Sequence, residues 1–450
     1  MMSLRMTATS ATSCGCHAGE SRGRGIKLSP SDHVLWTGYA NAMPIRQTRH
    51  ANAPLVWRGN RMLMCCRMNV AFSDSRAVDK VLDGERINQE EALELYRLPL
   101  NQLGQLADYR RQLAKKDAFG GRGNEIVTYI VDRNINYTNV CNVYCKFCAF
   151  YRTEKDADHY VLSHEDIDGK IDELLAIGGI QILMQGGHHP KLGIDYYLDL
   201  LHHLREKYPQ VNIHAFSPPE FNHFSEVFRM PLREVISKFR DAGLGSIPGG
   251  GGEILVDRVR NRIAPLKCNS DQWLKVMEIA HELGLNSSAT MMFGHVETPE
   301  DRIEHLERLR QLQDQTGGFT AFICWTFQPE NVVLKATPVG SAEYLRTQAL
   351  ARIYLDNFEN LQSSWVTQGP RIGQIALRFG ANDFGSVMME ENVVSQAGTT
   401  FRITREDIER LISEAGYQPR TRDNWYRLTE TPTSPEKNAV IADDAVIASN

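Results

Sequence analysis

The stretch that decides the fold runs from a candidate strand into a cysteine-rich loop. Residues 127–135 read Val-Thr-Tyr-Ile-Val-Asp-Arg-Asn-Ile, and residues 139–152 read Asn-Val-Cys-Asn-Val-Tyr-Cys-Lys-Phe-Cys-Ala-Phe-Tyr-Arg. The first run is apolar and β-branched, as in a buried strand. Cys141, Cys145 and Cys148 follow it at C-x3-C-x2-C spacing. Three thiolates this close can converge on soft iron, and three ligands leave one iron of a four-iron cluster open for catalysis.

Strand and helix signals alternate on both sides of this loop. Apolar runs predict strands at 127–135, 181–184, 211–216, 244–247, 286–293 and 320–327, with weaker candidates at 363–366 and 379–387. Helical periodicity lies between them, at 165–177, 196–208, 232–242, 271–283, 299–312 and 342–360. This α/β alternation predicts parallel strands joined by right-handed crossovers. The span of about 260 residues favours a complete or nearly complete eight-stranded (β/α) barrel, and a doubly wound open sheet is the alternative.

The two ends of the chain differ from this α/β centre. Residues 1–72 hold eight Arg and one Lys against Glu20 and Asp32, without sustained periodicity. We interpret them as a disordered or non-native extension, either an Arg-rich transit peptide or sequence before a true start at Met68. Residues 73–120 predict a helical lead-in, 121–426 the barrel with a C-terminal helix, and 427–450 a disordered tail.

Composition narrows the classes of function. The 450 residues carry a formal net charge of −5, which argues against a nucleic-acid binder with a basic face. The chain has no apolar run of the about 18 residues that a transmembrane helix needs, so we expect no membrane partner. Nine cysteines without a secretory signal make a disulfide scaffold a poor interpretation and favour the cytoplasm.

Two other interpretations of the cysteines remain open. A zinc knuckle would take Cys268 or a nearby His as its fourth ligand, although zinc usually pairs its ligands in two C-x2-C-like halves. A non-catalytic iron–sulfur protein that carries electrons would need the cysteines but not the long β/α repeat.

The cysteine spacing, with Phe147 just before the last cysteine, resembles the radical S-adenosylmethionine superfamily. The resemblance implies a 4Fe–4S cluster on Cys141, Cys145 and Cys148, with S-adenosylmethionine bound at the open iron. One electron would cleave S-adenosylmethionine to methionine and a 5′-deoxyadenosyl radical. Phe147 matches the family's aromatic residue whose neighbourhood contacts adenine.

Loops after later strands match further family elements. Gln185, Gly186 and Gly187 match the glycine-containing motif beside the methionine amino group, although the Gln185 position is often acidic in relatives. Glycines there let the backbone approach a ligand closely. The stretch from Gly294 to Glu297 resembles the G-x-x-E element near adenine.

A third glycine-rich loop has a less specific signal. Glu253 follows four glycines and is a candidate to bind substrate or S-adenosylmethionine. Because no Lys-Ser or Lys-Thr follows these glycines, a P-loop is excluded.

Further stretches narrow the resemblance to the futalosine and deazaflavin enzymes of this superfamily. They are residues 136–139, 148–152, 184–190, 214–220 and 378–385. The form His188-His189-Pro190 is most similar to the branch that cyclises dehypoxanthine futalosine in menaquinone biosynthesis. Siblings that make aminofutalosine or a deazaflavin are the alternative.

The resemblance also implies a reaction and its partners. Hydrogen abstraction from ribose C4′ is followed by C–C bond formation to the benzoate ring and by loss of one electron and one proton. Dehypoxanthine futalosine is then the substrate, and a flavodoxin or ferredoxin is the expected electron donor.

This chemistry needs an anion site and a proton acceptor. A benzoate carboxylate calls for a forked guanidinium, so Arg258 and Arg378 are substrate-binding candidates. The candidate proton acceptors or substrate ligands are His188, His189, Glu297 and Asp383.

Overall fold

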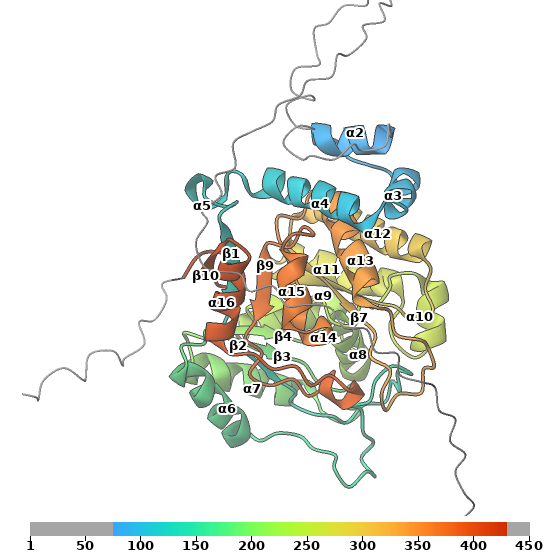
Figure 1. The fold of residues 1–450 in the computed structure, drawn as a ribbon. Helices are drawn as coiled ribbons and strands as arrows, with labels where there is room; N and C mark the ends of the chain where they lie inside the picture. Colours follow the sequence, from blue (N-terminus) through green and yellow to red (C-terminus); the bar gives the residue numbers. More distant parts are fainter. Residues whose placement is uncertain (1–74, 430–450) are drawn as a thin grey trace, which may run out of the picture. The chain divides into compact units, whose positions relative to one another are not determined.

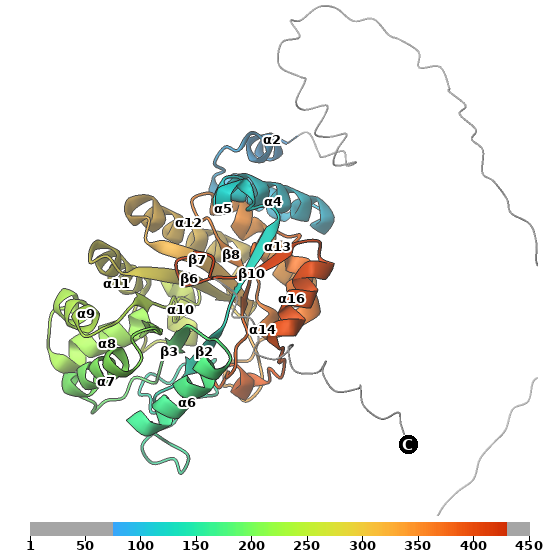
Figure 2. The same cartoon turned by 90° about the vertical axis from the view of Figure 1, so that its left-hand side faces the viewer.

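One parallel, ten-stranded sheet forms the centre of the molecule, which we describe from a computed structural model. The structure describes residues 75–429; the predicted extension, including the proposed start at Met68, and residues 430–450 of the predicted tail lie outside the described residues. The strand order is β10-β1-β9-β8-β7-β6-β5-β4-β3-β2. The strands are β1 (Ile126–Ile130), β2 (Asp132–Ile135), β3 (Gln181–Met184), β4 (Asn212–Ala215), β5 (Ser246–Ile247), β6 (Asn286–Phe293), β7 (Phe319–Thr326), β8 (Leu361–Gln362), β9 (Asp383–Ser386) and β10 (Gln418–Thr421). Helices follow the strands and cover the outer face of the sheet (Figures 1 and 2).

The sheet curls back onto its own first strand. β1 and β2 are separated by Val131 alone, yet β1 pairs with β9 and β10 whereas β2 pairs with β3. At the junction the Val387 N–H donates to the Ile130 carbonyl (3.1 Å) and the Ile180 N–H donates to the Val131 carbonyl (3.2 Å). The (β/α) barrel predicted from the sequence is therefore confirmed, with β10 as an additional strand beside β1.

Helices on the outer face begin close to their predicted first residues. They are α6 (His164–Ala176), α7 (Ile194–Lys207), α9 (Leu232–Asp241), α11 (Ser270–Glu282), α12 (Pro299–Thr316), α13 (Ser341–Tyr354) and α16 (Arg405–Glu414). Ser163 begins α6 through a capping box: the Asp166 N–H donates to its hydroxyl (3.1 Å), and the Asp166 carboxylate accepts from its backbone N–H (3.0 Å). Among residues 75–429, no helix has the length and apolar character needed to cross a membrane.

Three local predictions differ from the structure. The single strand expected at 127–135 is divided at Val131. The strand expected at 363–366 is wrong, because β8 ends at Gln362 and α14 (Trp365–Gln368) follows, with the Trp365 indole donating to the Ser386 carbonyl (3.0 Å). The helix expected to reach residue 360 ends at Tyr354.

Short elements were missed by periodicity. They are α5 (Ala118–Gly121), α8 (Pro218–Phe228), α10 (Asp257–Ile263), α15 (Pro370–Ala376), the 3₁₀ turn Ser395–Ala397 and β10. α8 opens with two prolines, which resemble a turn in the sequence but are tolerated in the first turn of a helix.

The N-terminal helical extension is present as α2 (Arg76–Asp83), α3 (Gln89–Tyr96) and α4 (Leu100–Lys115). α4 lies across the end of the sheet where the strands begin (Figures 1 and 2). The Lys115 ammonium donates to Asn360 Oδ1 (3.0 Å) just before β8. Gly104 faces the Phe379 ring so closely that a Cβ would lie 2.6 Å from it. The opposite end of the sheet, where the strands finish, is left to the loops that carry the sequence motifs.

Two helical glycines test this packing. Gly169→Ala in α6 adds a Cβ to open space, so we expect the removal of glycine to raise the free energy of unfolding by about 0.5–1 kcal/mol. Gly104→Ala gains the same helix propensity but must displace the Phe379 ring, at an overpacking cost of about 1–3 kcal/mol. Denaturant unfolding of both variants should move the midpoints in opposite directions. Equal stabilisation of the two would contradict the close approach of α4 to the barrel.

Candidate functional site

The cysteine loop lies at the end of β2 and is held by backbone hydrogen bonds to several elements. The Cys141 N–H donates to the Arg152 carbonyl (2.9 Å), and the Lys146 N–H donates to the Ile263 carbonyl at the end of α10 (2.8 Å). The Arg152 guanidinium in turn donates to the carbonyls of Ala149 (3.1 Å) and Tyr151 (3.0 Å). The loop is therefore shaped by the protein itself.

Three free thiols share this loop. Cys145 is buried, and Cys141 and Cys148 are partly buried. Burial raises the pKa of the Cys145 thiol to about 12, and the Lys267 ammonium opposes this rise. In the described part of the chain no group of three His, Cys, Asp or Glu side chains is close enough together to hold a metal ion. Three neighbouring, unpaired sulfur donors on a preformed loop fit a 4Fe–4S cluster.

The loop after β3 packs directly beneath the cysteines. A Cβ on Gly187 would lie 2.2 Å from the Val140 carbonyl oxygen and 2.9 Å from the Cys141 Cβ, so only glycine fits. The Gly186 N–H donates to Glu220 Oε1 (3.0 Å), and the Tyr137 hydroxyl donates to the same oxygen (2.9 Å). Glu220, at the start of α8, is a buried carboxylate that fixes this loop.

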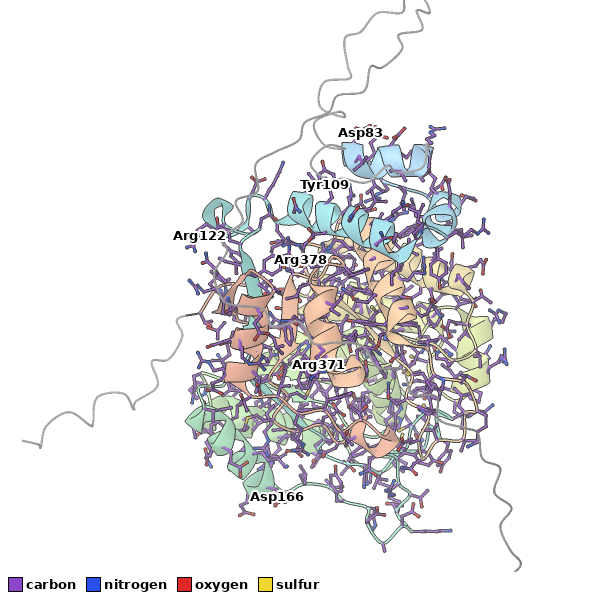
Figure 3. The ribbon with its side chains drawn as sticks, in the orientation of Figure 1. Asp83, Tyr109, Arg122, Asp166, Arg371 and Arg378 are labelled. Carbon is purple, nitrogen blue, oxygen red and sulfur yellow. The ribbon has the colours of Figure 1, made fainter. Side chains whose placement is uncertain are left out.

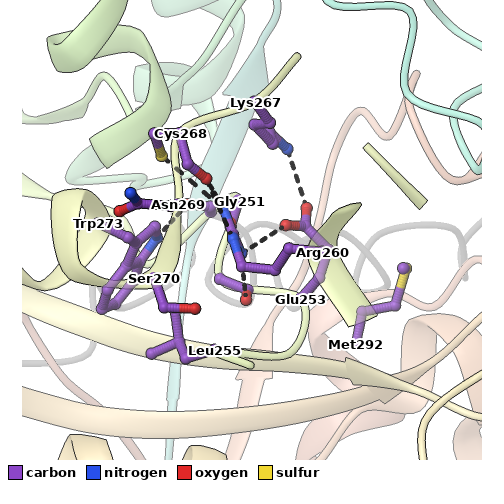
Figure 4. Close-up of polar contacts among 12 residues, drawn as sticks. Gly251, Glu253, Leu255, Arg260, Lys267, Cys268, Asn269, Ser270, Trp273 and Met292 are labelled. Atoms are coloured by element: carbon purple, nitrogen blue, oxygen red, sulfur yellow. Dashed lines mark hydrogen bonds and ion pairs between the residues drawn. The ribbon is translucent and has the colours of Figure 1, made fainter. Parts of the chain in front are cut away.

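A second buried carboxylate braces the loop after β5 (Figure 4). Glu253 Oε1 accepts from the Lys267 ammonium (2.9 Å), and Arg260 lies 3.5 Å from Glu253 Oε2 while it donates to the Gly252 carbonyl (2.9 Å). The Lys267 ammonium also lies 5.3 Å from the centre of the Phe147 ring, in the middle of the cysteine loop. The structure therefore brings Glu253 and Phe147 together through a buried cation that the sequence did not single out.

Glu297 has a comparable structural environment in the loop after β6. Its carboxylate accepts from the Gly294 N–H (2.6 Å) and the His295 N–H (2.9 Å), and Arg302 donates to it (2.9 Å). Burial alone would raise the pKa of Glu297, but His295 and Arg302 outweigh it and lower the pKa. A fully paired, ionised carboxylate holds this loop in place and is poorly suited to accept a proton.

A cavity of about 260 Å³ lies inside the curled sheet. Its walls come from alternate residues of the strands, for example Gln181 and Leu183 of β3 and Ser288 and Thr290 of β6, as expected for inward positions of a barrel. Gln185, the one predicted site residue on its wall, lies at the end toward the cysteine loop. A cavity that connects this end with the interior can hold an elongated substrate away from water.

The titratable side chains of the cavity wall are Asp132, His214, Glu391, Arg422 and Tyr426. Asp132 accepts hydrogen bonds from the Ser386 hydroxyl and from Gln181 Nε2 (3.3 Å), and burial raises its pKa. Burial lowers the pKa of His214 to about 3, so this imidazole is neutral. None of the five was a candidate from the sequence. One feature of the sequence could have indicated them: a polar residue, such as Asp132, at an inward position of an otherwise apolar strand.

Asp383 lies behind the cavity wall as the partner of Arg422. It accepts from Arg422 Nε (2.6 Å) and Nη2 (2.9 Å) and from the Thr128 hydroxyl (2.6 Å), and its side chain is fully buried. The structure thus gives Asp383 a supporting role and presents Arg422 to the cavity.

His188, His189, Arg258 and Arg378 do not line the cavity. His188 packs against the His223 ring, 4.9 Å away between centres, and burial lowers its pKa well below 6.5. His189 accepts a hydrogen bond from His223 through its carbonyl (3.1 Å). Arg258 is half-exposed and pairs with Asp301 on the outer surface.

Arg378 lies at the wrong end of the barrel for the predicted role. It precedes β9 and lies beside α4, where the strands begin (Figure 3). Its guanidinium donates to the Ala415 carbonyl (2.6 Å) and stacks on the Tyr417 ring. Neither predicted arginine is therefore brought to the cavity, because a surface partner or a helix end holds each of them elsewhere.

A curled β/α sheet with three free thiols on the loop after β2 defines a (β/α) barrel protein with a cysteine-rich loop at the carboxyl end of its strands. Solved structures share this fold: methylornithine synthase (PylB) matches with a TM-score of 0.59 at 18% identity, covering 76% of this chain and 97% of that one. The hydrogenase maturase HydG from Carboxydothermus hydrogenoformans matches with a TM-score of 0.59 at 16% identity, covering 82% of each chain.

Sequence comparison identifies the family. Residues 135–309 match the radical SAM superfamily and residues 316–435 match the CofH/MqnC C-terminal region. The chain belongs to the radical SAM superfamily, whose enzymes use a 4Fe–4S cluster and S-adenosylmethionine. It is therefore an enzyme, and the zinc-knuckle and electron-carrier interpretations are set aside.

Several relatives match most of the chain. A cyclic dehypoxanthine futalosine synthase from Halalkalibacterium halodurans is 43% identical over 79% of this chain and 94% of its own length. An enzyme of the same name from Streptomyces coelicolor is 44% identical over 82% and 92%. An aminodeoxyfutalosine synthase from Thermus thermophilus is 38% identical over 78% and 94%.

Gly187 offers a test of how the cluster loop is supported. In Gly187→Ala the new Cβ meets the Val140 carbonyl, so the loop must shift at a cost of about 1–3 kcal/mol, and we expect much lower iron and sulfide content after anaerobic reconstitution. Gly193→Ala is the matched control, because a Cβ there meets nothing within 4 Å. Wild-type iron content in the Gly187 variant would show that the loop does not depend on this contact.

Proposed function

We propose that this enzyme converts dehypoxanthine futalosine to its cyclic, spiro-fused product. Relatives that carry this activity in their names are 43–44% identical to the chain over more than nine-tenths of their length, whereas the aminodeoxyfutalosine synthase is 38% identical. The observation that carries the proposal is the cavity inside the curled sheet, which has a mainly apolar wall with a few polar side chains and includes Gln185, close to the cysteine loop. Such a cavity suits an elongated nucleoside-like substrate.

The residues at the end of the barrel where the strands finish, which we call the mouth, would bind the two cofactors. Cys141, Cys145 and Cys148 would bind the cluster, and Phe147, Gln185, Gly186, Gly187, Glu253 and Gly294 would surround S-adenosylmethionine. When bound, the reduced cluster supplies the electron that cleaves S-adenosylmethionine to the 5′-deoxyadenosyl radical. The buried Lys267 ammonium lowers the pKa of the Cys145 thiol, which burial raises, and so offsets part of the cost of ionising this sulfur.

The side chains of the cavity wall would hold the substrate while it reacts. The C4′–H bond breaks toward the adenosyl 5′ carbon, and the resulting carbon radical forms a C–C bond to the benzoate ring. The ring would then release one proton to a side chain of the cavity wall and one electron to the oxidised one-electron carrier, a flavodoxin or ferredoxin, which restores its aromaticity. Misplacement of reacting atoms by about 1 Å can cost 100-fold in rate, so the enclosing strands serve to position the substrate.

We propose that Asp132 accepts the proton that the benzoate ring releases. It replaces the proton acceptors predicted from the sequence. Asp132 lines the cavity, and burial raises the pKa of its carboxyl group, which makes the carboxylate a stronger base. His188 is removed from the cavity wall, and Glu297 and Asp383 are occupied by Arg302 and Arg422.

The reaction also requires a one-electron partner. A flavodoxin or ferredoxin would supply electrons to the cluster, and the cytoplasm, where thiols stay reduced, is the compartment we infer. The free state of all five cysteines in residues 75–429 supports this.

Product analysis tests the proposed reaction. Anaerobically reconstituted protein with dehypoxanthine futalosine, S-adenosylmethionine and a reductant should yield a product lighter than the substrate by two hydrogen atoms. With substrate deuterated at C4′, mass spectrometry should find the label in 5′-deoxyadenosine. Formation of 5′-deoxyadenosine without a substrate-derived product would point instead to a sibling activity.

Asp132→Asn tests the assigned proton acceptor. Loss of a general base typically costs about 100-fold or more, so we expect cyclic product to fall by that order while S-adenosylmethionine cleavage continues. His188→Asn is the comparison, because this residue does not line the cavity. Near-normal product from the Asp132 variant and loss of product from the His188 variant would return the role to His188.

A further inference from the structure

Lys146, in the middle of the cysteine loop, joins this loop to two other segments of the mouth. Its N–H donates to the Ile263 carbonyl at the end of α10 (2.8 Å), and its carbonyl accepts from the Leu334 N–H in the loop after β7 (2.7 Å). Three segments that are far apart in the sequence therefore meet at a residue that lies between Cys145 and Cys148. Side chains that these segments expose share one surface beside the cysteines.

Each of the three segments adds one exposed cation to this surface. They are Lys146 in the cysteine loop, Arg262 in the last turn of α10 and Lys335 in the loop after β7. Within residues 75–429 none of the three pairs with a carboxylate, and the Lys335 ammonium donates only to the Val332 carbonyl (3.3 Å). Three positive charges on neighbouring segments are thus left without a counter-charge from the described chain.

Acidic residues of the same segments are engaged with other groups. The engaged pairs are Asp257 with the Ser270 hydroxyl (2.6 Å), Glu253 with Lys267 (2.9 Å), Glu154 with Lys191 (2.6 Å) and Asp158 with Arg152 (2.7 Å). Glu330, at the start of the loop after β7, faces Gly398, where a Cβ would lie 2.4 Å from its Cδ. The carboxylates nearest along the chain therefore do not neutralise the three cations.

Exposed apolar side chains accompany the cations, again one from each segment. Tyr144, Leu266 and Val333 are 48%, 65% and 67% exposed. A single exposed apolar residue is ordinary, but three on adjoining segments, with three cations beside them, have the mixed character of a protein–protein interface. The six residues that we call the cluster-loop face are Tyr144, Lys146, Arg262, Leu266, Val333 and Lys335.

The cluster-loop face suits a small contact with a negatively charged protein. Because the chain has a net charge of −5, an acidic partner is repelled by the chain as a whole and is directed to unpaired cations. Such charges act over about 8 Å at physiological salt and mainly speed the encounter. Complexes that transfer electrons have small interfaces, below about 1,200 Å². A partner on this face stands next to the sulfur donors, since Lys146 directly follows Cys145.

We propose that the cluster-loop face is the docking site of an acidic one-electron carrier protein. Carboxylates of the carrier pair with the three cations of the face, and its apolar residues contact the three exposed apolar side chains. This inference rests on the proposed function for the need of an electron at the cysteine loop. One electron passes from the reduced carrier to the cluster, the carrier leaves oxidised, and no covalent bond forms or breaks between the two proteins.

The rate of cluster reduction in the cluster-loaded full chain tests the face. The probe is a reduced, acidic flavodoxin, and the readout is the electron paramagnetic resonance signal of the reduced cluster in rapidly frozen samples. Arg262→Glu and Lys335→Glu should each slow this reduction by about three- to tenfold at low salt, because a like charge opposes the encounter. The difference should shrink as salt is added. Reduction by photoreduced deazariboflavin, a small uncharged reductant, should keep its wild-type rate.

Two further sets of variants complete the test. Leu266→Ser and Val333→Ser keep the charges of the face and remove apolar contact, so they should weaken flavodoxin binding in an equilibrium titration at every salt concentration. Arg205→Glu is the matched charge control. Arg205 is exposed, donates only to the Pro209 carbonyl (3.0 Å), and lies in the last turn of α7, before β4 begins and away from the mouth. Its reversal should leave both the reduction rate and the binding unchanged.

Several outcomes overturn the docking site. Wild-type reduction by flavodoxin that is absent or independent of salt, unchanged rates in the charge variants, or unchanged binding in the serine variants would each do so. Equal slowing by Arg205→Glu would show an effect of net charge alone, and equal slowing with deazariboflavin would show an effect on the cluster. Failure of the proposed function is separable from all of these. A chain that accepts electrons from flavodoxin through this face but makes no cyclic product retains the docking site and loses the assigned reaction.

Discussion

Closure of the sheet through a divided first strand is the constraint on which the rest of the structure depends. A regular strand can pair with only one neighbour on each side. Because the chain passes from β1 to β2 over Val131 alone, the edge that holds β10 in its first half is free for β3 in its second. The sheet curls as a result, its inward side chains surround a cavity, and all loops that follow the strands meet at one end.

Buried carboxylates hold in place the loops at the end of the barrel where the strands finish. Glu220, Glu253 and Glu297 each stand behind a glycine-containing loop, and each is paired with backbone N–H groups or with a cation. An unpaired charge at such depth would be costly, whereas a charge-assisted hydrogen bond to a loop amide is strong and directional. These acids therefore shape the mouth, while the groups free to meet a substrate lie deeper on the strands.

The sequence predicts the barrel fold and the position of the cysteine loop, but it does not predict which residues line the cavity. Alternating apolar runs and helical periodicity predict the barrel because parallel strands are buried on both faces, and the cysteine spacing identifies its own loop. The interior depends on which residues of each strand point inward, and strands as short as the two-residue β5 and β8 give no readable alternation. Arg422 could not be anticipated, since it enters from a turn beyond the last predicted helix. Arg258 and Arg378 were plausible by charge alone, and only packing shows that each is engaged elsewhere.

The two sequence matches both contribute to the interior of the barrel. The cysteine loop lies within the radical SAM match at 135–309, whereas Arg422, which pairs with Asp383, lies within the second match at 316–435. The cavity wall takes Ser288 from the first match and Gln362 from the second. Exchanges confined to the second segment therefore alter one side of the interior and leave the sulfur donors as they are.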